Sequence, residues 1–248
     1  MKSTIIRLFS LALLISVASA SVQAQEKPWN FEFGLGGNLN SGNINNIGFR
    51  SNAGAGRDDS IRAIYANVHF LYNEENKQTT NMGLDGSINF DYYRNIHWSP
   101  FLAIECVTNH FKGYDFKTSF LGGIKYTFLY EPKVYDYSIS AALVGDYVNY
   151  HVEDPTADTL DGVKLRVSVR EQIRHKIGES ASINHSAFYQ PALNDPSDFI
   201  FTTVTKISNN LNKIISLDFI LRYDYRSVVP SGKHHHDLTT EIALKIKF

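Results

Sequence analysis

The sequence predicts an all-β fold, a transmembrane antiparallel up-and-down β-barrel of about 12 strands. From Leu238 to Phe248 almost every even position is apolar, while most odd positions are polar or charged. A strand turns successive side chains to opposite faces, so this segment has one apolar and one polar face. The chain also carries 14 Tyr and 16 Phe, yet its mean hydropathy is -0.22. Apolar and polar faces average out in this way in a barrel that meets lipid outside and water inside.

The N-terminal segment 1–24 is predicted to be a secretory signal peptide. Two basic residues precede the apolar run 8–17, and small residues follow it. This run is shorter than the roughly 20 residues that a membrane-spanning helix requires. Cleavage is expected after Ala20 or Ala24, which leaves 25–248 as the barrel domain of a protein exported to the outer membrane of a Gram-negative cell.

Twelve segments show the alternation expected of barrel strands. They are residues 29–40, 46–57, 61–73, 81–93, 98–110, 118–130, 137–150, 162–176, 181–190, 199–208, 214–226 and 238–248. An even number of strands places both chain ends on one side of the membrane. The outer connections then begin near residues 41, 74, 111, 151, 191 and 227, and the inner turns near 58, 94, 131, 177 and 209. The outer set is longer on the whole, as in bacterial barrels with short periplasmic turns.

Two segments place an acidic residue beside apolar ones. In 98–110, Glu105 shares its face with apolar side chains, and we assign the opposite face, with Cys106 as a small apolar filler, to lipid. In 162–176, Glu171 falls on the outward face. We expect it at the membrane rim, where an acidic side chain costs less than at the bilayer midplane.

Several short segments carry a resemblance to a known family. They are Ser41-Gly42-Asn43, the stretch 109–115 (NHFKGYD), the stretch 121–126 (LGGIKY) and the final strand with Thr239-Thr240. Together they resemble the domain-of-unknown-function 481 family, whose members are often labelled salt-induced outer-membrane proteins. The likeness covers essentially all of the mature chain. It implies a barrel in the outer membrane and carries over no catalytic residue. The terminal Phe248 resembles the sorting signal that such barrels present to the barrel assembly machinery, and we predict it to be an assembly signal.

The best functional candidates form a ladder of four cations on one face of segment 162–176: Lys164, Arg166, Arg170 and Arg174. Each would cost ~2 to 4 kcal/mol at the bilayer midplane, so the ladder must point into the lumen. Three acidic residues are predicted to line the facing wall: Asp85, Asp91 and Glu105.

Two interpretations of this ladder stay open. In the first, the basic and acidic walls line a small pore and tune its ion selectivity. In the second, inward acids neutralise the ladder and fill the lumen with salt bridges, because buried charges are normally paired. The acids available for this are Asp146, Asp218, Asp224 and Glu241.

No catalytic, cofactor-binding or metal site is predicted. The triplet 234–236 is all histidine, but three adjacent residues in a loop cannot converge on one ion without other ligands. A lipid-hydrolysing site would need an outward hydroxyl beside His185, and only Thr203 or Thr205 on the next strand could supply it. The single cysteine excludes an internal disulfide and a cysteine-based zinc site.

We therefore expect a non-enzymatic outer-membrane barrel, most simply a small porin-like diffusion channel with a mixed-charge lumen. The alternatives are a closed barrel that supports envelope integrity, stress response or surface interactions, and, less favoured, a lipid-modifying enzyme. The expected partners are outer-membrane lipid, the assembly machinery and small solutes or ions. The formal net charge of -1 argues against nucleic acid.

Overall fold

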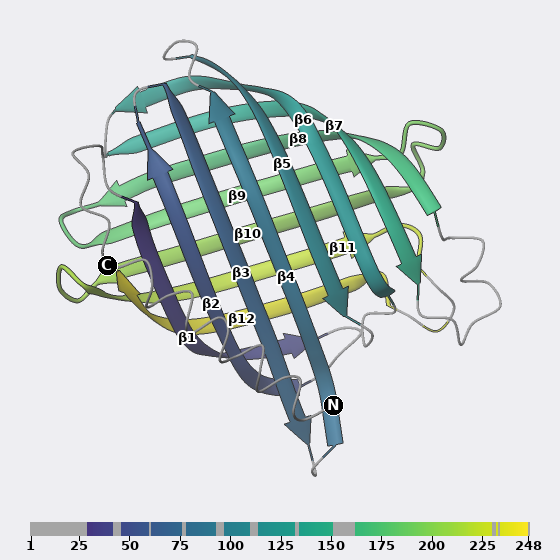
Figure 1. Ribbon diagram of the computed structural model, residues 1–248, viewed down its shortest axis with the longest axis horizontal. Coiled ribbons are helices and arrows are strands. Elements are labelled where there is room, and N and C mark those ends of the chain that lie inside the picture. Colours follow the sequence, from purple (N-terminus) through teal and green to yellow (C-terminus); the bar gives the residue numbers. More distant parts are fainter. Residues whose placement is uncertain are drawn as a thin grey trace.

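A single sheet closed on itself forms the fold in the computed structural model (Figure 1). The structure describes residues 29–41, 46–59, 61–75, 78–92, 97–109, 114–131, 134–150, 162–229, 232 and 234–247. The predicted signal peptide and Phe248 lie outside these ranges. In the described part of the chain, no helix is long and apolar enough to cross a membrane.

Twelve strands follow one another along the chain. They are β1 (Asn30–Ser41), β2 (Asn46–Asp58), β3 (Arg62–Glu75), β4 (Gln78–Tyr92), β5 (Trp98–Asn109), β6 (Tyr114–Glu131), β7 (Tyr135–Tyr150), β8 (Gly162–Ile177), β9 (Ala181–Pro191), β10 (Phe199–Asn210), β11 (Ile215–Arg226) and β12 (His236–Lys247). Each pairs antiparallel with its neighbour in sequence, and β1 closes the barrel against β12, with Leu35 opposite Leu244. The predicted fold class, a barrel of twelve antiparallel strands, is confirmed.

Alternate residues separate the outer surface from the lumen. Large apolar side chains on the outward face are strongly exposed, for example Leu102 at 61%, Leu143 at 65% and Ile242 at 56%. Polar side chains on the opposite face are buried in the wall, for example Asp146 at 3% and Asp218 at 2%. This inverts the distribution of a water-soluble protein, and it is the arrangement of a barrel whose outer solvent is hydrocarbon.

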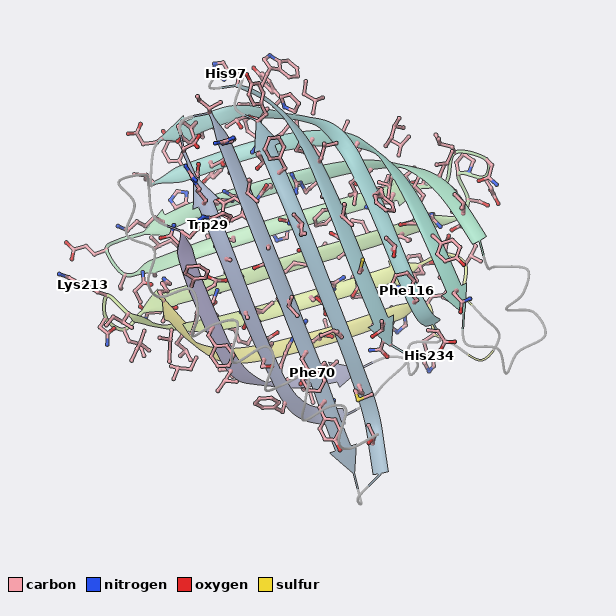
Figure 2. All side chains as sticks on the ribbon, viewed as in Figure 1. Trp29, Phe70, His97, Phe116, Lys213 and His234 are labelled. Carbon is pink, nitrogen blue, oxygen red and sulfur yellow. The ribbon has the colours of Figure 1, made fainter. Side chains whose placement is uncertain are left out.

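The two rims of the barrel differ. The connections after the even-numbered strands are short and meet at the rim that also holds Asn30 and Lys247; we name this rim the turn end. The three longest connections, residues 151–161, 192–198 and 227–235, belong to the opposite rim, the loop end. Figure 2 shows His97 and Lys213 at the turn end and His234 at the loop end. This asymmetry is the one predicted from the sequence.

Aromatic rings mark both ends of the outer surface. Near the turn end, the Trp98 and Tyr126 ring centroids are 4.7 Å apart. Near the loop end, the Phe199 ring lies 5.4 Å from Tyr189 and 5.6 Å from Tyr225. Such girdles flank the apolar band of membrane barrels.

β6 departs most from its expected bounds, since it starts at Tyr114 rather than at 118. The pairing of β6 with β7 shifts register between Tyr114 and Phe116, and again between Thr127 and Leu129. A β-bulge inserts one extra residue and so breaks the period of two, which is why alternation alone does not find these strand ends.

Candidate functional site in the barrel lumen

The cation ladder lies on the inward face of β8. The register with β7 sets Lys164 opposite Asp146, Arg170 opposite Ser140 and Arg174 opposite Asp136. Paired residues in antiparallel strands point to the same face, so cations and potential partners share the lumen wall.

Arg166, at the loop-end part of the ladder, is held by a dense set of contacts. It is 4% exposed, its Nη2 lies 2.8 Å from Asp198 Oδ1, and its Nε lies 3.4 Å from Asp146 Oδ2. Its Nη1 donates to the backbone carbonyls of Asp198 at 2.9 Å and Gln190 at 3.1 Å. Arg166 is therefore a buried structural cation.

The loop of residues 192–198 brings Asp198 to this position. An isolated bridge between Arg166 and Ala192, with the Leu193 amide donating to the Leu165 carbonyl at 2.8 Å, continues the β8–β9 pairing past Pro191. Lys164 Nζ also lies 2.7 Å from Asp198 Oδ2. The sequence did not point to Asp198, because its partners are 32 and 34 positions away along the chain.

Acid is expected to loosen this loop. Burial by itself raises the pKa of Asp198, but hydrogen bonds from Lys164 and Arg166 outweigh burial and hold the pKa below its ordinary value of 3.8. The resulting stability is fully present above 3.8 and is lost as the pH falls through the lower pKa of the folded protein. Limited proteolysis between residues 192 and 198 should therefore accelerate below this pH. The Asp198→Asn variant should be cleaved faster than the unmodified protein at neutral pH, and its cleavage rate should rise less in acid. An equal rise in both proteins would contradict this assignment.

Arg170, in the middle of the ladder, has different surroundings. Its guanidinium carbon lies 5.4 Å from the ring centroid of Phe101 on β5 and 5.8 Å from that of Phe188 on β9. Its Nε donates to Ser140 Oγ at 3.2 Å. Within the described residues no carboxylate lies within ion-pair distance of it. Two aromatic rings thus position the cation while its remaining N–H donors keep no acidic partner.

Arg174, the ladder residue nearest the turn end, is only loosely neutralised. Its Nη1 lies 3.8 Å from Asp136 Oδ2, and its side chain is 49% exposed. At this separation the pair is an electrostatic contact rather than a hydrogen bond.

The three predicted acids occupy β4 and β5. Asp91 lies 3.6 Å from Lys125, and Asp85 lies 3.9 Å from Arg50 with its side chain 43% exposed. Glu105 is exposed, and no ion pair joins it to another described residue. Asp91 and Glu105 both attract Arg170 through space. An acidic wall that keeps contact with solvent therefore lies near the unpaired cation.

The other acids considered as partners of the ladder mostly pair elsewhere. Asp146 does contact Arg166, but Glu241 binds Arg50 at 3.1 Å and Asp218 lies 3.5 Å from Lys245. Asp224 binds Arg222 at 2.7 Å. The sequence interpretation did not single out Arg50 and Lys245, although both lie on the inward positions of alternating strands. Their places on the polar, inward-facing positions of their strands could have identified them.

The remaining candidates do not assemble a metal or hydrolytic centre. Among the described residues, no group of three or more His, Cys, Asp or Glu is arranged to hold a metal ion. His235 stacks on Tyr225 with ring centroids 6.0 Å apart. His185 Nδ1 lies 2.8 Å from Thr205 Oγ1, but within the described chain no carboxylate lies within ion-pair distance of His185 to orient it as a catalytic base.

Comparison with known sequences identifies the family. The family model described as "Protein of unknown function, DUF481" matches residues 33–248. The chain belongs to this family. The resemblance noted in the sequence is thus confirmed, and no curated protein matches this DUF481 chain in sequence.

Solved structures similar to the DUF481 barrel are outer-membrane barrels. The NanC porin superposes with a TM-score of 0.57 at 10% identity, covering 87% of this chain and 100% of the porin. A bacterial polysaccharide outer membrane secretin gives 0.50 at 8% identity, with 91% and 100% covered. The KdgM porin in complex with disordered oligogalacturonate gives 0.50 at 7% identity, with 88% and 99% covered. At such identities the likeness establishes a porin-like fold alone.

Proposed function

We propose that this DUF481 barrel is a small diffusion channel of the outer membrane that favours anions, with Arg170 as the residue that sets the preference. The observation that carries the proposal is an inward guanidinium that contacts two rings and has no carboxylate within ion-pair distance among the described residues, beside acids that contact solvent. Charged groups of this kind along a pore wall determine which ions pass. The porin-like fold supports the proposal.

The placement of the ion pairs favours an open path over a lumen plugged by salt bridges. Arg166 and Asp146 lie on adjacent strands, as do Lys245 and Glu32 at 2.9 Å. Lys125 and Asp91 lie on β6 and β4, with one strand between them. The ion pairs described above thus run along the wall instead of crossing the lumen. Pairs of this kind brace the wall without having to block the axis, as the proposed channel requires.

Planar-bilayer recording of the purified full chain tests the proposal. We expect discrete conductance steps, and under a salt gradient we expect a reversal potential displaced toward that of the anion. Protein unfolded by boiling before addition is the control and should give no steps. A shift of mobility in SDS gels on boiling shows that the protein is folded. If folded protein gives no conductance steps, the proposed channel is wrong and a closed structural barrel is favoured.

A further inference from the structure

A group of polar side chains interrupts the outward face of β8, β9 and β10. The register sets Glu171 opposite Ala187, which lies opposite Thr203, and sets His185 opposite Thr205 on the same face. We name Glu171, His185, Thr203 and Thr205 the polar island. Elsewhere the outward wall carries large apolar side chains such as Leu102 and Leu143.

The island lies near the middle of β8, β9 and β10 rather than at their ends. β9 has 11 residues, about the length needed to cross a bilayer, and His185 lies near its middle. Tyr189 and Phe199 mark the loop-end girdle beyond the island. Glu171 lies six positions before the end of β8 at Ile177, and its expected place at the membrane rim stays a prediction.

Two groups of the island lack partners within the described chain. The hydroxyl of Thr205 forms a hydrogen bond with Nδ1 of the His185 ring at 2.8 Å. The other ring nitrogen, Nε2, has no hydrogen bond or ion pair with any described residue. The same holds for the Glu171 carboxylate, which is exposed. Glu171 and His185 are diagonal neighbours on adjacent strands but do not reach ion-pair distance of each other. Polar groups left unpaired in hydrocarbon are costly.

We propose that the outward face of β8–β10 is the contact between two copies of this chain, in which His185 of each copy donates to Glu171 of the other. One unpartnered group is an acid and the other a base, so the surface is complementary to itself. A two-fold axis makes a contact of residue i with residue j occur twice. Two barrels inserted in the same direction can be related by such an axis along the membrane normal. Within one copy, Glu171 and His185 are diagonal neighbours, because His185 lies two residues before Ala187, the residue opposite Glu171.

The surroundings of the island favour a protein partner over a lipid one. Ala187 and the two threonines are small, so a second wall can approach closely at this position. Lipid phosphates lie at the membrane surface and would not reach the middle of β9. A hydrolytic role would require a carboxylate to orient His185 within the same chain. The second copy is the occupant that supplies both missing partners.

Disulfide trapping tests the proposed contact directly. In a full chain with its only cysteine replaced by Cys106→Ser, Glu171→Cys with one tag and His185→Cys with another are produced in the same cells. We expect the mixed-tag disulfide to exceed the control pair by about tenfold or more, because a bridge requires Cα atoms about 4.4 to 6.8 Å apart. The matched control is Phe120→Cys with Leu143→Cys, which have the same diagonal relation on β6 and β7. Equal yields from both pairs would overturn the proposal.

Sedimentation in detergent gives an independent test that does not use cysteine. We expect the unmodified chain to sediment as a dimer and Glu171→Leu to weaken self-association by about tenfold or more. Glu171→Gln keeps an acceptor for His185 and should remain dimeric. Gel mobility before and after boiling checks that each variant is folded. A monomeric unmodified chain, or folded Glu171→Leu with unchanged association, would refute the contact.

Discussion

Arg166→Gln is expected to lower the free energy of unfolding of the barrel by about 3–5 kcal/mol, the usual cost of removing one member of a buried ion pair. The change would leave Asp198 with Lys164 and Asp146 with Lys117 as their remaining cationic contacts, and it would release the backbone carbonyls to which the guanidinium donates. Chemical unfolding of the protein in detergent or lipid, followed by tryptophan fluorescence, measures the loss.

Lys164→Gln is the matched control for Arg166→Gln. Lys164 also contacts Asp198, but its side chain is 27% exposed and Arg166 would still neutralise the carboxylate. We expect a loss within about 1 kcal/mol, as for exposed ion pairs. If both substitutions lower the free energy of unfolding equally, Arg166 does not stabilise the loop end of the barrel in the way inferred here.

Arg170→Glu has the largest expected effect on selectivity: the reversal potential should change sign and favour cations. Two unit charges about 4 Å apart in water interact by about 1 kcal/mol, so exchanging a positive for a negative neighbour changes the energy of a passing ion by about 2 kcal/mol. This is a factor of more than about ten in relative occupancy. Stability should also fall, because the new carboxylate lies near Asp91 and Glu105 and the contacts of the guanidinium with the two rings are lost.

Lys213→Glu makes the same charge change in the exposed turn between β10 and β11, away from the lumen wall (Figure 2). It should leave the reversal potential nearly unchanged. Bilayer recording of both variants in one salt gradient separates a local effect of Arg170 from an effect of net charge. A folded Arg170→Glu channel with unaltered selectivity would remove Arg170 from the proposed path.

Alternation was enough to predict the strands and to assign their faces. Strong examples are β4 and β11, where polar and apolar residues alternate with a period of two that only Ile220 breaks on the inward face of β11. The predicted start of β6 at residue 118 was wrong, since the strand begins at Tyr114 and a register shift there interrupts the period of two. The signal peptide and the assembly role of Phe248 stay predictions.

The ion pairs of the lumen were harder to predict than its faces. Parity placed Arg166 and Arg170 on one face, but their different environments depend on elements distant in sequence. Asp198 reaches Arg166 only because the loop after β9 continues along β8, and Phe101 reaches Arg170 from β5. Such contacts follow from barrel closure and register, which a single strand does not encode.

The pairing of β1 with β12 also determines when the wall can be completed. Lys245 meets Glu32 across 213 positions of sequence, and ten consecutive residues of β1, from Glu32 to Ser41, pair with β12 on the side that faces away from β2. Until His236–Lys247 has been synthesised, both edges of the growing sheet expose unpaired N–H and C=O groups that hydrocarbon cannot satisfy. The sheet therefore keeps two free edges until the twelve-residue strand β12 pairs with β1.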